Sequence, residues 1–204
     1  MLKHTKGPSG PFLLNKYLMF TSHPLRQDWT QPLPKYWCDN SPFKTHFLNA
    51  QSIAFPSAER FFISIVKQYR DSVTDPVLKA EVAEFVKQEI WHTYAHEQYN
   101  KWLDSQGVAA TRLANTSDRR FEWIKKTFSP VSQLAITVAF EHITALTGAH
   151  SLQHRSFLKS MNPHFENIWH GTALKKWNTN QLPWIYGYLQ TVIKLVDNWH
   201  WYLL

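Results

Sequence analysis

From about residue 50 onward, apolar residues recur at intervals of three and four positions, the spacing that places side chains on one face of an α-helix. The alternation of apolar and polar residues that is typical of a half-buried strand is not found in the sequence. Prolines mark the helix starts. Pro76, Pro130 and Pro163 each follow a capping residue directly, and Pro56 stands next to Ser57 at the start of an earlier helix. The pattern predicts an all-α protein, most simply an antiparallel helical bundle.

The predicted helices have the following limits. They run from about residue 56 to 70, from 76 to a glycine stop at Gly107, from about 130 to 148 or a little beyond, and from 163 onward. At a rise of about 1.5 Å per residue, the second of these helices is roughly 45 Å long. Helices of this length can span a whole domain and carry several side chains into its core.

The remaining segments differ in character from these helices. Residues 1–50 are rich in proline, polar and aromatic residues without sustained periodicity, so we expect an irregular N-terminal arm with at most a short helix. We expect the bundle itself over residues 51–172. Residues 173–204 form a divergent tail that is rich in tryptophan, and we expect self-association through this tail.

Composition and charge narrow the class of protein. The chain has 204 residues, 44% of them hydrophobic, enough for one domain with a sizeable core. The formal net charge is +7, but the basic residues do not cluster and no nucleic-acid-binding motif accompanies them, so we expect no specific nucleic-acid binding. A single cysteine, Cys38, excludes an intrachain disulfide. Because neither a signal peptide nor a membrane-spanning run is found, we expect a cytoplasmic protein.

Three carboxylates fall on the apolar faces of the predicted helices. Glu59 lies four residues after Phe55 and three before Phe62, and Glu89 and Glu141 occupy comparable positions in their own helices. An ionised carboxylate in a protein core costs several kcal/mol unless it is paired or binds a metal. No lysine or arginine shares these faces, so the pattern indicates a bound cation.

The spacing of Glu89 and His92 supports a metal site. Residues three positions apart on a helix can reach the same ion, and His96 adds another polar group on that face as a ligand, a partner of a ligand or a proton carrier. We predict Glu59, Glu89, His92 and Glu141 as metal ligands, and Glu89, His92 and His96 as catalytic residues. A lone Glu-x-x-His is common in helices that bind no metal, and an inward glutamate can also be a satisfied polar core residue. Three such helices together favour metal.

These residues lie within motifs that resemble those of the bacterial predicted metal-dependent hydrolases, which are similar to the ferritin-like di-metal carboxylate proteins. The motifs together extend over about residues 35–170. They are Phe-Pro-Ser-Ala-Glu-Arg-Phe-Phe at 55–62, Gln-Glu-Ile-Trp-His at 88–92 with His96 and Asn100, Leu-Ala-Ile-Thr at 134–137 continuing to Glu-His-Ile-Thr-Ala at 141–145, and Trp-His at 169–170.

The resemblance implies a ferritin-like bundle in which two helices each supply a glutamate and two supply Glu-x-x-His, together holding two divalent metals. Iron is the metal we expect first, with manganese and zinc as alternatives. The family's description implies hydrolysis of a small-molecule substrate. A carboxylate-rich site resembles di-iron oxidases and oxygenases equally well, so oxidative chemistry stays open.

The chain departs from the family's pattern after Trp169-His170. Where the fourth helix would supply its Glu-x-x-His, residues 171–178 read Gly-Thr-Ala-Leu-Lys-Lys-Trp-Asn. In an adjacent reading frame, the codons of Trp177-Asn178 and of Trp184-Ile185 necessarily encode Glu and Asp, at the spacing the family requires. We hypothesise that the sequence after about residue 172 results from a frameshift, which predicts one or two bound metals and impaired activity. A metal-free helical protein with an interaction or structural role is the alternative.

Overall fold

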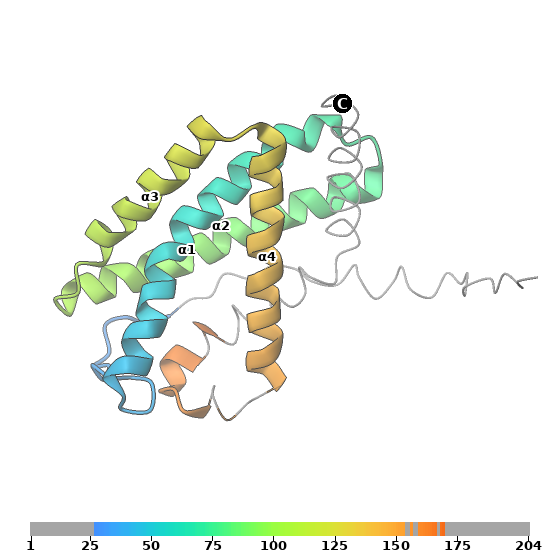
Figure 1. The fold of residues 1–204 in the computed structure, drawn as a ribbon. Coiled ribbons are helices and arrows are strands. Elements are labelled where there is room, and N and C mark those ends of the chain that lie inside the picture. The colour runs from blue at the N-terminus through green and yellow to red at the C-terminus, as the bar shows by residue number, and fades with distance from the viewer. Residues whose placement is uncertain (1–26, 154–155, 157–158, 167, 170–204) are drawn as a thin grey trace, which may run out of the picture.

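The computed structural model describes residues 27–153, 156, 159–166 and 168–169 (Figure 1). In this part of the chain the protein is an all-α helical bundle, as the sequence predicts. Within the described residues, an isolated bridge pairs Cys38 with Met161.

The bundle is built from helices that reverse direction one after another (Figure 1). The helix α1 is central and contacts α2, α3 and α4. The elements in chain order are α1 (Pro42–Tyr69), the short 3-10 helix η2 (Arg70–Ser72), α2 (Pro76–Ser105), α3 (Ala110–Thr127) and α4 (Pro130–Gln153).

The first helix begins earlier than predicted. Its N-cap is Ser41, whose hydroxyl accepts a hydrogen bond from the Lys44 amide at 3.3 Å, and Pro42 occupies the first turn. The prediction that Pro56 opens this helix is therefore wrong, because Pro56 is buried inside it. Residues 42–50, which we expected to precede the helix, belong to it.

The second helix agrees with its predicted limits. The carboxylate of Asp75 accepts a hydrogen bond from the Val77 amide at 2.8 Å, which caps the helix start. After Ser105, Gly107 adopts a φ of +81°, a conformation that side chains with a Cβ rarely adopt. The glycine stop ends α2 as predicted.

The helix α3 was not predicted, and its sequence explains why. It is strongly polar, and Ala110 is its one buried residue. Phe121 and Ile124 are partly buried, and both pack against the core formed by α1, α2 and α4. The helix is amphipathic but poor in apolar residues overall, and its N-cap Ala109 makes no side-chain capping bond, so no start signal marks it in the sequence.

The later helices begin where predicted. The helix α4 starts at Pro130 and ends at Gln153, a little beyond residue 148 as the sequence allows, and residues 163–166 and 168–169 are helical. His170 and the tail over residues 173–204 lie outside the described residues. Among the helices that the structure describes, none combines the length and apolarity that crossing a membrane requires.

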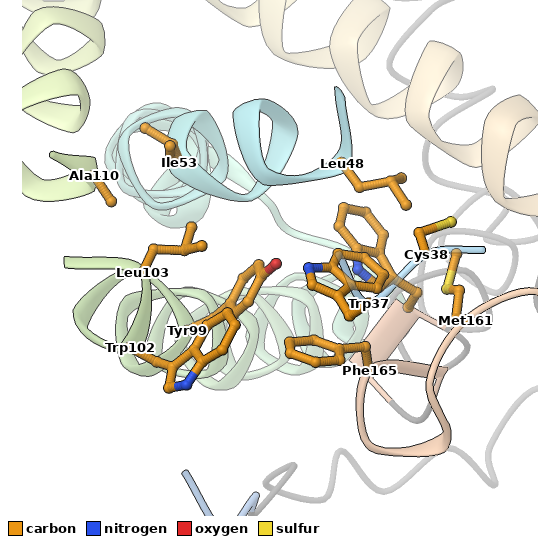
Figure 2. Close-up of a cluster of buried hydrophobic side chains, with 11 residues drawn as sticks. Trp37, Cys38, Leu48, Ile53, Tyr99, Trp102, Leu103, Ala110, Met161 and Phe165 are labelled. Carbon is orange, nitrogen blue, oxygen red and sulfur yellow. The ribbon is translucent and has the colours of Figure 1, made fainter. Parts of the chain in front are cut away.

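In the part of the chain that the structure describes, two hydrophobic clusters stabilise the bundle. The Trp37 cluster joins the start of α1 to the end of α2, and Figure 2 shows its side chains between these helices and the chain near Phe165; it comprises Trp37, Cys38, Leu48, Ile53, Tyr99, Trp102, Leu103, Ala110, Met161, Phe165 and Trp169. The Phe61 cluster joins the other ends of the same helices to α4; it comprises Ala58, Phe61, Phe62, Ile65, Val66, Val82, Phe85, Leu134 and Val138. Between the clusters, α1 and α2 face each other with polar side chains.

Candidate metal centre

The polar segment between the two clusters contains buried carboxylate, imidazole and hydroxyl side chains from both helices. Ser52 and Glu59 come from α1, and Glu89, His92 and His96 come from α2. Glu59 exposes 1% of its surface and Glu89 exposes 0%. Carboxylates this deeply buried are rare unless they are paired, hydrogen-bonded or bound to a metal.

Glu59, Glu89 and His92 form the candidate metal group. One carboxylate oxygen from each glutamate and one imidazole nitrogen of His92 all lie within 4.8 Å of one another. The oxygen Oε1 of Glu59 is in ion-pair contact with Nδ1 of His92. Because Glu89 and His92 are three residues apart, they project from one face of α2 toward Glu59 on α1. Two carboxylates and an imidazole are a donor set that suits divalent transition metals.

Glu141, the fourth residue predicted as a ligand, is also buried and exposes 1% of its surface on α4. Among the described residues it is not part of the group whose ligand atoms lie within 4.8 Å of one another. The structure thus brings three of the predicted ligands together and buries the fourth on the neighbouring helix.

Thr93 supports the group and was not predicted. Its hydroxyl oxygen lies 2.9 Å from Oε2 of Glu59 and 2.8 Å from the backbone carbonyl of Glu89, and its one hydrogen can be donated to either. Through this contact, Thr93 on α2 restrains the carboxylate of Glu59 on α1. The sequence does carry a signal, because Thr93 follows Glu89 by four residues and so shares its face.

His96 lies behind His92 rather than within the group of ligand atoms. The Nε2 atoms of the two rings are 3.1 Å apart, and Nδ1 of His96 lies 2.8 Å from the hydroxyl oxygen of Ser52. The same hydroxyl donates to Oδ1 of Asn100 at 3.2 Å. Of these partners, Ser52 was not singled out from the sequence, since a serine inside a helix is an ordinary residue.

Aromatic rings surround the two histidines. The ring of Phe55 lies 4.9 Å from that of His96 at an interplanar angle of 70°, and 5.9 Å from that of His92. The ring of Trp169 lies 5.9 Å from that of His96. Apolar rings at this distance lower the local dielectric constant, which strengthens every electrostatic interaction in the site.

Arg60 follows Glu59 in the sequence but points away from the site. Its guanidinium group pairs with Glu97 at 2.6 Å and with Asp118 at 2.9 Å, and all three side chains are exposed. These contacts tie α1 to α2 and α3 at the surface and direct the charge of Arg60 outward.

A family model described as predicted metal-dependent hydrolase matches residues 21–172 of the chain. The match covers most of the sequence and includes all the predicted ligands and His96. Comparison with curated proteins and with solved structures gives no match.

Proposed function

Because this chain belongs to the family of predicted metal-dependent hydrolases, we propose that it binds a divalent transition metal between α1 and α2 and hydrolyses a small-molecule substrate there. The observation that carries the proposal is the buried group of Glu59, Glu89 and His92, whose ligand atoms lie within 4.8 Å of one another. We place the site in a ferritin-like bundle of the di-metal carboxylate type, and the protein in the cytoplasm.

The chemistry of the donor set supports this proposal. Two carboxylates buried side by side repel each other and have lost the solvation of water, and a bound cation offsets both costs. Carboxylate oxygens combined with an imidazole nitrogen suit iron, manganese and zinc. We propose iron first because carboxylates outnumber imidazoles among the predicted ligands.

Each residue has a distinct role in this proposal. When bound, a divalent metal acts as a Lewis acid and lowers the pKa of water at an open position. Glu59, Glu89 and His92 hold the ion, Glu141 on α4 is the fourth ligand, and Thr93 orients the Glu59 carboxylate. Because residues 171–178 lack the family's fourth-helix ligands, we propose one bound metal and low turnover.

A metal count by mass spectrometry on protein purified without chelator tests the binding step. The expected result is near-stoichiometric iron, manganese or zinc in the wild type and its loss in Glu89→Gln. The matched control is Glu97→Gln, which removes an exposed carboxylate from the same helix and keeps the metal. A folded wild-type protein that holds no metal and is indifferent to Glu89→Gln contradicts the proposal.

Removal of the metal by a chelator gives an independent test. A ligand present at 100 times its dissociation constant stabilises the folded state by about 2.7 kcal/mol. In a protein of this size that free energy corresponds to a change in Tm of about 5 to 10 °C. We expect this drop when the wild type is treated with chelator, and no drop for Glu89→Gln.

The reaction type is tested by anaerobic assays with chromogenic carboxylic and phosphate esters. Hydrolysis proceeds without dioxygen, so metal-dependent turnover under these conditions supports a hydrolase. Metal-dependent consumption of dioxygen without ester turnover supports the di-iron oxidative alternative instead.

A further inference from the structure

We infer that Asn100, Ser52 and His96 form a hydrogen-bonded chain with a single direction, which makes Nε2 of His92 a donor and leaves Nδ1 of His92 to bind the metal. This inference deepens the proposed metal site and depends on it for its functional consequence. His96, Ser52 and Asn100 are positioning residues in this scheme, because they act on the metal through His92.

The chain of hydrogen bonds starts at Asn100. Its Nδ2 donates to the backbone carbonyl of Ser52 at 3.2 Å, and a carbonyl can only accept, so the NH2 group of the amide must face it. This carbonyl is available because the residue four positions later is Pro56, which has no N–H to donate. The oxygen Oδ1 of Asn100 therefore faces the other way, toward the hydroxyl of Ser52.

The direction passes from Asn100 to His96 through that hydroxyl. Since Oδ1 of Asn100 can only accept, the single hydrogen of the Ser52 hydroxyl is used in the 3.2 Å bond between them. Toward Nδ1 of His96, at 2.8 Å, the hydroxyl oxygen must accept, so Nδ1 carries a hydrogen. A neutral imidazole carries one hydrogen, which leaves a lone pair on Nε2 of His96.

The lone pair on His96 determines the role of His92. The two Nε2 atoms lie 3.1 Å apart, so Nε2 of His92 donates and Nε2 of His96 accepts. Nδ1 of His92 is the atom in ion-pair contact with Glu59, so it faces the candidate metal group, and the proton it shares with that carboxylate is released to solvent when a metal binds there. A ligand imidazole whose other N–H is held by an acceptor keeps its ring orientation and gains basicity toward the metal.

The positions of these residues explain how two helices support the chain. His92, His96 and Asn100 follow one another at intervals of four residues on α2, so their side chains lie above one another on one face. Ser52 faces them from α1 and supplies both its hydroxyl and its backbone carbonyl. All four side chains are buried, which protects the hydrogen bonds from competing water.

The direction of the chain is tested first on metal-free protein by long-range proton–nitrogen NMR spectra of the histidine rings at about pH 8, where an ordinary imidazole is neutral. The expected result is a protonated Nδ1 and an unprotonated Nε2 in His96. The opposite tautomer overturns the inference. This measurement involves no metal, so its outcome does not depend on whether the proposed function is correct.

The positioning role is tested by titrating zinc into His96→Gln and His96→Leu. The glutamine variant offers an amide oxygen to Nε2 of His92, so we expect an affinity within about threefold of the wild type. The leucine variant offers no acceptor, and we expect a loss of about 10- to 100-fold. Circular dichroism checks that both variants fold. Equal affinities for the two variants overturn the positioning role, whereas absence of binding of zinc, iron(II) and manganese(II) alike by the wild type contradicts the proposed function itself.

Discussion

The side-chain amide of Asn100 on α2 occupies the hydrogen-bonding position that Pro56 leaves open on α1. Pro56 lies inside α1 and cannot donate to the Ser52 carbonyl one turn earlier, and Asn100 donates to that carbonyl at 3.2 Å instead. A proline inside a helix normally costs about 3 kcal/mol, part of which comes from the missing hydrogen bond. Here a hydrogen bond from the partner helix replaces the missing one, and it orients the amide of Asn100 next to the candidate metal centre.

This relationship predicts that Asn100 and Pro56 are energetically coupled. In the wild type, Asn100→Leu leaves the buried Ser52 carbonyl without its donor, and we expect a loss of about 1–3 kcal/mol in the free energy of unfolding. In a Pro56→Ala background the new N–H reaches the carbonyl, so the same change costs about 1 kcal/mol less. Urea unfolding of the four proteins of this double-mutant cycle measures the coupling.

A second cycle serves as the control for Asn100. Pro76 stands in the first turn of α2, where its missing N–H leaves no carbonyl unsatisfied. Pro76→Ala and Asn100→Leu should therefore be additive within about 0.5 kcal/mol. Additivity of Asn100→Leu with Pro56→Ala as well contradicts the replacement of the hydrogen bond.

The hydroxyl of Thr93 is expected to strengthen metal binding. Thr93→Val keeps the shape of the side chain but removes the hydrogen bond to Glu59, so that carboxylate loses a restraint that holds it toward the ion. We expect metal affinity to fall about 10-fold, and Thr93→Ser, which retains the hydroxyl, to restore most of it. Competition with a coloured chelator measures both. If valine and serine bind metal equally well, the hydroxyl does not restrain the ligand.

The grouping of the three candidate ligands could be predicted from the sequence because helical spacing governs the positions of their side chains directly. Glu89 and His92 are three residues apart on one helix, and Glu59 shares its face with apolar residues, so both features are visible without coordinates. Thr93 and Ser52 were missed because small hydroxyl residues occur in many helices, often bonded to the preceding turn. Their role depends on the partner helix, which the sequence does not place.

The errors in the fold have a similar physical origin. Pro56 was interpreted as a helix start because proline in a helix interior is unfavourable, but a contact from α2 compensates for it. The true start at Ser41-Pro42 has the same capping signature and lies in a stretch without apolar period. The helix α3 lacks the signals that mark the other helix starts, because Ala109 at its N-cap offers no capping side chain and no proline follows it.

The adjacent residues Arg60 and Phe61 of α1 should differ in how much they contribute to the free energy of unfolding. Arg60 bridges Glu97 and Asp118 at the surface, and exposed ion pairs contribute little, so Arg60→Ala should cost at most about 1 kcal/mol. Phe61 exposes 1% of its surface in the Phe61 cluster, so Phe61→Ala should cost about 3–5 kcal/mol. Urea unfolding measures both. Added salt should reduce the smaller effect and leave the larger one. A cost above 2 kcal/mol for Arg60→Ala contradicts this ranking.

The last prediction concerns acid stability and His164. Partial burial of this ring lowers its pKa below the ordinary value of 6.5, while the nearby carboxylate of Asp28 opposes the shift. The unfolded chain therefore binds a proton more readily than the folded one, and folding stability decreases as the pH falls below about 7. His164→Gln removes the titrating ring. The free energy of unfolding of this variant should therefore depend less on pH than that of the wild type.

Asp28→Asn should increase the pH dependence of stability, whereas His164→Gln reduces it, because the asparagine removes the charge that favours the protonated ring of His164. The folded-state pKa of His164 should then fall further, and the pH dependence of stability just below pH 6.5 should become steeper. Urea unfolding at several pH values between 5 and 8 measures the slopes of all three proteins on metal-free material. Identical slopes in the wild type and both variants contradict the assignment, since a ring with equal proton affinity in both states adds nothing to the slope.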